Sequence, residues 1–162
     1  VPIFEKKQIA EVNEFLKQRR IVVVVKLHPL QDLGDFNNVE MENFVLLSHD
    51  EFSRRKMDLY KFMGQCDALI TDYSSIFYDF LLLNRPMAFT VDDESDYADT
   101  RGFAVSDPEA YKPGFRIHNA EDFYRFIDDL SKNVDAYEND RKRVDALAND
   151  FHSDFSLIPF SC

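Results

Sequence analysis

The chain has 162 residues, 45% of them hydrophobic and sixteen of them Phe, a composition typical of a folded globular domain rather than a disordered segment. Lys and Arg number 19 against 30 Asp and Glu, which gives a formal net charge of -11 at pH 7. Such a surface repels a phosphate backbone and argues against general nucleic-acid binding, although a small nucleotide in a locally neutral pocket stays compatible with it.

Helical and extended patterns alternate along the chain. Ile9, Val12 and Leu16 recur at helical spacing, whereas the β-branched run 21–25 is typical of a strand buried on both faces. The same patterns predict helices at about 5–19, 57–65, 75–83, 121–130 and 134–151, and strands at 21–25, 44–47, 68–71, 87–91, 103–105 and 115–118. His49 and Asp50 are expected in a loop or a helix cap, and the basic run 54–56 at the solvated start of a helix.

Strands that alternate with helices predict an α/β fold with an open, parallel, Rossmann-like sheet. No internal repeat or flexible linker interrupts the pattern, so we expect residues 1–162 to form a single domain. Because the chain does not begin with Met, we expect it to be a fragment of a longer protein. In such sheets ligands bind beyond the carboxyl ends of the strands.

The most informative segment follows the third predicted strand. It runs through Thr71, Asp72, Tyr73, Ser74 and Ser75 directly into an amphipathic stretch. A strand that passes into a helix through small hydroxyl residues leaves backbone N–H groups for an anion, and Asp79 lies one helical turn after Ser75. The segment therefore indicates a nucleotide diphosphate site, with a carboxylate for the ribose hydroxyls. The alternative is a capped helix whose first-turn acid merely suits the helix dipole.

A histidine follows the first predicted strand. Pro29 disfavours helical geometry at His28, so the imidazole is expected just beyond the strand end. An imidazole transfers protons near neutral pH or, when charged, binds phosphate. A surface or core histidine is the alternative, and the neighbouring phosphate-type segment favours the functional interpretation.

Several motifs together resemble one family. They are Lys26-Leu27-His28-Pro29, the segment 66–75 (CDALITDYSS), Tyr78-Asp79-Phe80, Asn84-Arg85-Pro86, Tyr97, Arg101-Gly102-Phe103 and Pro113-Gly114. Over roughly residues 20–130 the chain resembles the CDP-glycerol glycerophosphotransferases of teichoic acid synthesis, the polymerases and primases. The resemblance implies a two-lobed glycosyltransferase-B architecture, of which this chain matches the C-terminal, nucleotide-binding lobe.

The resemblance also implies a reaction. A hydroxyl at the end of a polyol-phosphate acceptor would attack the β-phosphorus of CDP-glycerol, or of CDP-ribitol in a close relative, and release CMP. The enzyme would act in bacterial cell-wall biogenesis in the cytoplasm, at the inner face of the membrane. Membrane association would be peripheral, through parts other than this chain, and the N-terminal lobe would be a missing partner.

Site residues follow from the same resemblance. His28 would be catalytic, contacting the donor phosphates or assisting proton transfer. Ser74 and Ser75 would hold the diphosphate, and Asp79 the ribose hydroxyls. Arg101 and Gly102 would line the glycerol phosphate or the lobe interface. The remaining residues expected at the nucleotide and phosphate site are Pro29, Thr71, Asp72 and Tyr73.

The chain departs from the family in two places. The family's other catalytic histidine belongs to the N-terminal lobe and has no counterpart here, and residues 151–156 lack the Asp-Gly and Ser-x-Arg of the family's C-terminal region. We therefore expect the isolated chain to bind nucleotide weakly and to show little or no transfer.

Other interpretations stay open. The same fold type binds UDP- or GDP-sugars in glycosyltransferases, and a non-catalytic α/β interaction module is a third possibility. No cofactor is expected besides the donor, and the acidic run 92–96 leaves a divalent cation open, although a solvated loop is the simpler interpretation. Cys66 and Cys162 lie far apart and suggest neither a disulfide framework nor a zinc site, which favours a reducing compartment.

Overall fold

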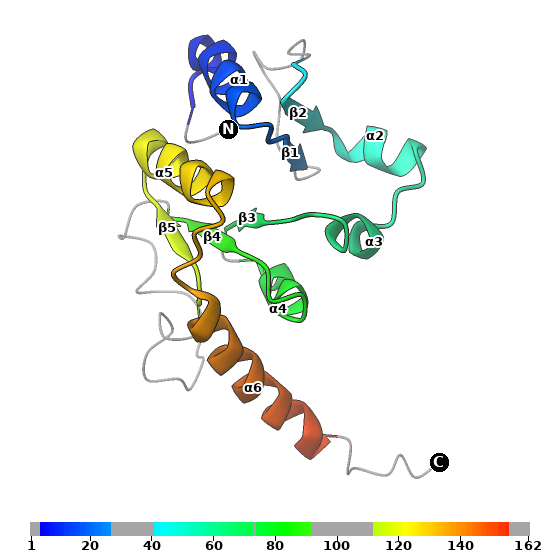
Figure 1. The fold of residues 1–162 in the computed structure, drawn as a ribbon. Coiled ribbons are helices and arrows are strands. Elements are labelled where there is room, and N and C mark those ends of the chain that lie inside the picture. Colours follow the sequence, from blue (N-terminus) through cyan, green and yellow to red (C-terminus); the bar gives the residue numbers. More distant parts are fainter. Residues whose placement is uncertain (1–3, 27–40, 73, 92–111, 156–162) are drawn as a thin grey trace. The chain divides into compact units, whose positions relative to one another are not determined.

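The computed structural model describes residues 4–26, 41–72, 74–91 and 112–155 (Figure 1). The chain divides into two compact units. Unit 1 comprises Val1–Gln65 and Asn119–Val134, and unit 2 comprises Cys66–His118 and Asp135–Cys162.

Unit 1 contains two parallel strands and most of the shorter helices. Its elements are η1 (Lys6–Gln8), α1 (Ile9–Gln18), β1 (Val23–Lys26), β2 (Phe44–Leu47), α2 (His49–Arg54), α3 (Leu59–Met63) and α5 (Ala120–Ser131). β1 and β2 pair in parallel, from Val23 beside Phe44 to Lys26 beside Leu47. α1 buries Ile9, Val12 and Leu16, which is the apolar face that the sequence predicts.

Charged and aromatic side chains link α1 to α5. Arg19 donates from Nε to Asp128 Oδ1 at 2.5 Å, and its guanidinium lies 3.4 Å from the centre of the Phe15 ring. Phe4 meets Phe123 edge-on at 4.9 Å. Because the Arg19–Asp128 and Phe4–Phe123 contacts join residues more than a hundred positions apart, α5 belongs to unit 1 despite its position late in the chain.

The described residues of unit 2 form a three-stranded parallel sheet with two helices. Its elements are β3 (Leu69–Thr71), α4 (Ile76–Leu81), β4 (Met87–Thr90), β5 (Phe115–Ile117) and α6 (Glu138–Phe155). The strand order is β3-β4-β5, with Leu69 beside Met87 and Ala88 beside Phe115. Each strand of this sheet was predicted, and the α/β fold with parallel sheets is confirmed.

Backbone packing fixes a glycine at the start of β5. A Cβ on Gly114 would lie 2.5 Å from the Met87 carbonyl oxygen and 2.9 Å from the Phe89 ring. No side chain fits at 2.5 Å from a backbone oxygen, so only glycine allows β5 to approach the beginning of β4 this closely.

A buried arginine holds the start of α6. Arg141 is 1% exposed, and its guanidinium donates to both carboxylate oxygens of Asp135 and, at 3.4 Å, to the carbonyl of Asn84. Asn84 follows α4 and has a left-handed backbone with φ of 46°. The hydrogen bonds from Arg141 lower the pKa of Asp135 below its usual 3.8, against the opposing effect of burial. Within the described residues, Arg141 Nε and Asn84 Oδ1 are buried without a hydrogen-bond partner.

Three sequence predictions need correction or qualification. The basic run Arg54–Lys56 ends a helix rather than starting one, because Ser48 accepts a hydrogen bond from Glu51 N–H and begins α2 earlier. β1 is half-buried rather than buried on both faces, because β2 is its only paired neighbour in the described part of the chain; Val22, just before β1, is 57% exposed. The strand expected at 103–105 lies outside the described residues. That residues 1–162 form one lobe stays a prediction.

The Arg141–Asp135 pair makes unit 2 sensitive to acid. Since the folded pKa of Asp135 is lowered, the pair stabilises the fold fully above the unfolded pKa, about 3.9. That contribution disappears as the pH falls through the folded pKa. We expect the free energy of unfolding, measured by urea denaturation between pH 6 and pH 2, to fall less steeply below about pH 4 in Asp135→Asn than in the unmodified chain.

Truncating the arginine tests the same pair at neutral pH. Arg141→Met should cost about 3 kcal/mol because it leaves a partly buried carboxylate unpaired. The control Lys142→Met removes an exposed neighbouring cation and should change stability by no more than about 0.5 kcal/mol. Equal losses in the two variants would contradict the assigned role of Arg141.

Candidate functional site

The carboxyl ends of three parallel strands lie at one edge of the unit 2 sheet. Thr71 is beside Phe89, and Thr90 is beside Ile117, so β3, β4 and β5 end within about one residue of one another. The segment from Asp72 to Ser75 leaves the sheet at this edge. This is the edge at which open α/β sheets bind ligands.

A local hydrogen bond shapes the turn after β3. Asp72 Oδ1 accepts from the Ser74 backbone N–H at 3.0 Å, an arrangement typical of an Asx turn. Asp72, Ser74 and Ser75 are all exposed. The Ser74 amide therefore points toward an anionic oxygen, which in this structure belongs to the protein's own carboxylate.

Ser75 lies at the N-cap position of α4 without acting as a side-chain cap. Its backbone is helical, with φ -61° and ψ -10°, and its hydroxyl makes no capping hydrogen bond. By contrast, the N-cap side chains of α2, α3 and α5 (Ser48, Asp58 and Asn119) each accept at least one hydrogen bond from a backbone N–H. The structure thus disfavours the interpretation of Ser75 as an ordinary cap.

α4 is held by aromatic packing on one face and presents polar groups on the other. Phe77 and Phe80 are buried, and the Phe77 ring meets Phe89 of β4 edge-on at 5.2 Å. Asp79 is exposed in the first turn, where a negative charge is favourable near the positive end of the helix dipole. Helical spacing puts Asp79 one turn after Ser75, as the sequence predicts.

Several predicted site residues lie outside the described residues. They are His28, Pro29, Tyr73, Arg101 and Gly102, together with the acidic run 92–96. Of the predicted set, the structure describes Thr71, Asp72, Ser74, Ser75 and Asp79 and brings them together on one strand–turn–helix segment. The assignment of each to a ligand stays a prediction.

Burial and the neighbouring Asp67 raise the pKa of the Cys66 thiol, and Arg85 offsets this only in part. The thiol is therefore protonated at neutral pH and a poor nucleophile.

In the described ranges no three His, Cys, Asp or Glu side chains gather into a candidate metal site. Nor does any helix there combine the length and apolar composition of a membrane span.

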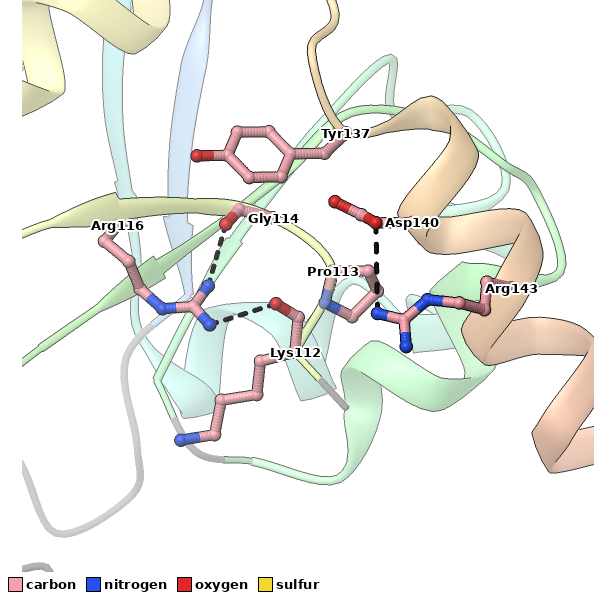
Figure 2. Close-up of a pocket in the computed structure, with 7 residues that line it drawn as sticks. All are labelled: Lys112, Pro113, Gly114, Arg116, Tyr137, Asp140 and Arg143. Carbon is pink, nitrogen blue, oxygen red and sulfur yellow. Dashed lines mark hydrogen bonds and ion pairs between the residues drawn. The ribbon is translucent and has the colours of Figure 1, made fainter. Parts of the chain in front are cut away.

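Unit 2 also has a pocket, which the sequence did not predict. It is lined by Lys112, Pro113, Gly114, Arg116, Tyr137, Asp140 and Arg143 (Figure 2). These residues come from two segments more than twenty positions apart, so no local motif joins them. Pro113-Gly114 was the one signal in the sequence, as part of the family resemblance.

Comparison with known proteins decides the family. Residues 4–155 match the family described as CDP-Glycerol:Poly(glycerophosphate) glycerophosphotransferase. The chain belongs to this family. The matched range extends beyond the 20–130 of the sequence-based resemblance and contains every predicted site residue, from His28 to Gly102.

Relatives with curated names are consistent with this assignment. A teichoic acid ribitol-phosphate primase from Bacillus spizizenii is 31% identical over 143 residues, which is 88% of this chain and 33% of the relative. A teichoic acid poly(glycerol phosphate) polymerase from Bacillus subtilis is 36% identical over 115 residues, 68% of this chain and 14% of the relative. A teichoic acid glycerol-phosphate primase from Bacillus subtilis is 30% identical over 121 residues, 75% of this chain and 28% of the relative. The chain thus spans a third or less of the length of these relatives, and it has no match among solved structures.

Ser75 makes no capping hydrogen bond and Ser48 does, so substituting each residue tests what Ser75 contributes to the free energy of unfolding. Ser75→Ala should leave the free energy of unfolding within about 0.5 kcal/mol, since its hydroxyl makes no capping bond. Ser48→Ala, the matched control, should cost about 1 kcal/mol because it removes a real cap. Urea denaturation followed by circular dichroism measures both. A loss in Ser75→Ala as large as that in Ser48→Ala would restore the capped-helix interpretation.

Proposed function

We propose that this chain is the donor-binding part of a polyol-phosphate transferase of teichoic acid synthesis, with CDP-glycerol as the donor. The match to the glycerophosphotransferase family over residues 4–155 carries the proposal. Its structural support is the Asp72–Ser75 turn at the carboxyl edge of the sheet, with an amide facing a carboxylate and an uncapped serine hydroxyl. Since named relatives include both glycerol-phosphate and ribitol-phosphate enzymes, CDP-ribitol is the alternative donor.

The proposed reaction is a phosphoryl transfer. The terminal hydroxyl oxygen of the acceptor bonds to the β-phosphorus of the donor, the bond from that phosphorus to the oxygen shared with the α-phosphate breaks, and CMP leaves. Positioning and charge stabilisation dominate the catalysis of such transfers. In this proposal His28 accepts the proton of the acceptor hydroxyl or binds the donor phosphates.

The described residues would bind the nucleotide. Ser74 and Ser75 would hold the diphosphate through amides and hydroxyls, and Asp79 would accept hydrogen bonds from the ribose. For the Ser74 amide to reach a phosphate oxygen, its bond to Asp72 must be exchanged for one to the ligand. Arg101 and Gly102 would contact the polyol phosphate or a second lobe.

The remaining parts of the proposal concern partners. Because the relatives are at least three times as long as the matched segment, a further lobe would complete a glycosyltransferase-B arrangement and bind the polyol-phosphate acceptor. The work would take place at the inner face of the bacterial membrane, with peripheral attachment through other parts of the protein. No cofactor is required besides the donor, and a divalent cation at the acidic run 92–96 is a separate hypothesis.

Calorimetric titration tests donor binding by the chain. CDP-glycerol and CDP should bind measurably, and UDP and UDP-N-acetylglucosamine at least about tenfold more weakly, since a pocket built for cytosine leaves buried polar groups unpaired against uracil. Asp79→Ala should weaken CDP binding about tenfold by removing the ribose acceptor. Asp67→Ala, an exposed acid that precedes β3, is the matched control and should bind like the unmodified chain. Preferential binding of the UDP ligands would indicate a sugar-transferring enzyme. No detectable binding of any nucleotide would favour a non-catalytic module.

A second prediction concerns His28. In the longer protein that contains this chain, His28→Ala should lower the rate of polyol-phosphate transfer by at least about a hundredfold, the scale of general acid–base catalysis. CDP binding should change much less, because Ser74 and Ser75, the residues proposed to hold the diphosphate, lie on another segment. Turnover and equilibrium binding measured on one preparation separate the two effects. Turnover equal to that of the unmodified enzyme would remove His28 from the mechanism.

A further inference from the structure

The pocket in Figure 2 lies away from the predicted donor site. Gly114 abuts Met87, the first residue of β4, so the pocket is at the amino-terminal edge of the sheet. The Asp72–Ser75 turn follows the carboxyl end of β3, at the opposite edge. All seven lining residues belong to unit 2. The pocket is therefore a separate feature of the same sheet.

Basic groups predominate in this pocket, although the chain as a whole is acidic. Among the described residues that line it, Lys112, Arg116 and Arg143 outnumber the one carboxylate, Asp140, in a chain of net charge -11. Figure 2 shows the guanidinium groups of Arg116 and Arg143 on either side of Pro113. Tyr137 adds a phenol. Two guanidinium groups and a phenolic hydroxyl are the donors with which proteins bind phosphate oxygens.

Arg116 is fixed in place before any ligand arrives. Its Nη1 donates to the Gly114 carbonyl at 2.7 Å and its Nη2 to the Lys112 carbonyl at 3.0 Å. The guanidinium also lies 5.1 Å from the centre of the Phe89 ring. Lys112, Pro113 and Gly114 are themselves buried. A guanidinium held in this way loses little conformational entropy on binding an anion.

Arg143 lies at the more exposed side. Its side chain is 55% exposed, and its Nη2 is 3.9 Å from Asp140 Oδ1, which is longer than a hydrogen bond. An exposed ion pair of this length contributes little, so an anion can compete with Asp140 for the guanidinium. Asp140 itself opposes a bound anion and favours a ligand that turns a hydroxyl toward it.

The pocket has a volume of about 280 Å³, just below the range of about 300–1,000 Å³ typical of drug-sized ligands. We propose that it binds a phosphate group, at a site additional to the donor site. The phosphate can come from a polyol-phosphate chain, a source that rests on the proposed function, or from free inorganic phosphate. A polyol phosphodiester offers both an anion for the guanidinium groups and a hydroxyl for Asp140.

The test is a titration of the full 162-residue chain with sodium phosphate and, separately, with a short glycerol-phosphate oligomer, at constant ionic strength. Nuclear magnetic resonance of the backbone amides reports the position and the affinity together. Shifts should be largest at Gly114, Arg116 and Tyr137. Arg143→Gln should weaken binding about tenfold, since it removes a charge-assisted donor. Lys142→Gln is the matched control on the same helix, 58% exposed, and should weaken binding less than twofold.

The outcomes separate this proposal from the proposed function. Phosphate binding that depends on Arg143 and is unchanged in Asp79→Ala supports the proposed phosphate site, even where CDP does not bind. Tighter binding of the oligomer than of inorganic phosphate identifies the polymer as the source, and equal binding identifies free phosphate. Equal affinity in Arg143→Gln and the unmodified chain, or loss of phosphate binding in Asp79→Ala instead, overturns the proposal.

Discussion

The buried guanidinium of Arg141 is the contact on which unit 2 depends. It reaches back from α6 to the Asn84 carbonyl after α4, and Asp135 balances its charge. A charge that is 1% exposed is tolerated only when paired, so the position of α6 is tied to that of the turn between α4 and β4. The next turn of α6 carries Val144 into the core and leaves Arg143 at the pocket. The Arg141–Asp135 ion pair thus positions α6, the turn that leads into β4, and the pocket residue Arg143.

β4 is the second constraint. Met87, Ala88 and Phe89 are fully buried, and β3 and β5 pair with the two sides of this strand. The Phe89 ring contacts Phe77 of α4 and lies under the Arg116 guanidinium. The same central strand therefore supports the helix that presents Ser75 and Asp79 at one edge and the basic pocket at the other. This arrangement requires glycine at position 114, because any side chain there would push β5 away from β4.

What the sequence could and could not predict follows from the range of the interactions. Strands and the turn after β3 depend on neighbouring residues, and the ordered set of short motifs over residues 20–130 led to the correct family. α2 was missed because six mostly polar residues show no helical period, and its Ser48 cap is a weak signal. Arg141-Lys142-Arg143 resembles a solvated basic run, yet helical geometry turns Arg141 inward and Arg143 toward the pocket. Arg141 and Asp135 are only six positions apart, but the burial of the pair beside Asn84, like the pocket, arises only when distant segments pack together.

The turn at Asp72 gives a physical reason to expect weak nucleotide binding by this chain. A donor site formed from backbone amides gains most when those amides are unsatisfied and preorganised. Here the Ser74 amide already donates to the Asp72 carboxylate, so an incoming phosphate gains one hydrogen bond only by replacing another. The displaced carboxylate then needs a new partner, or else it repels the phosphate that replaced it. In the proposed enzyme a basic side chain from another segment or lobe would pair with that carboxylate, and the donor site would bind strongly only when that side chain is in place.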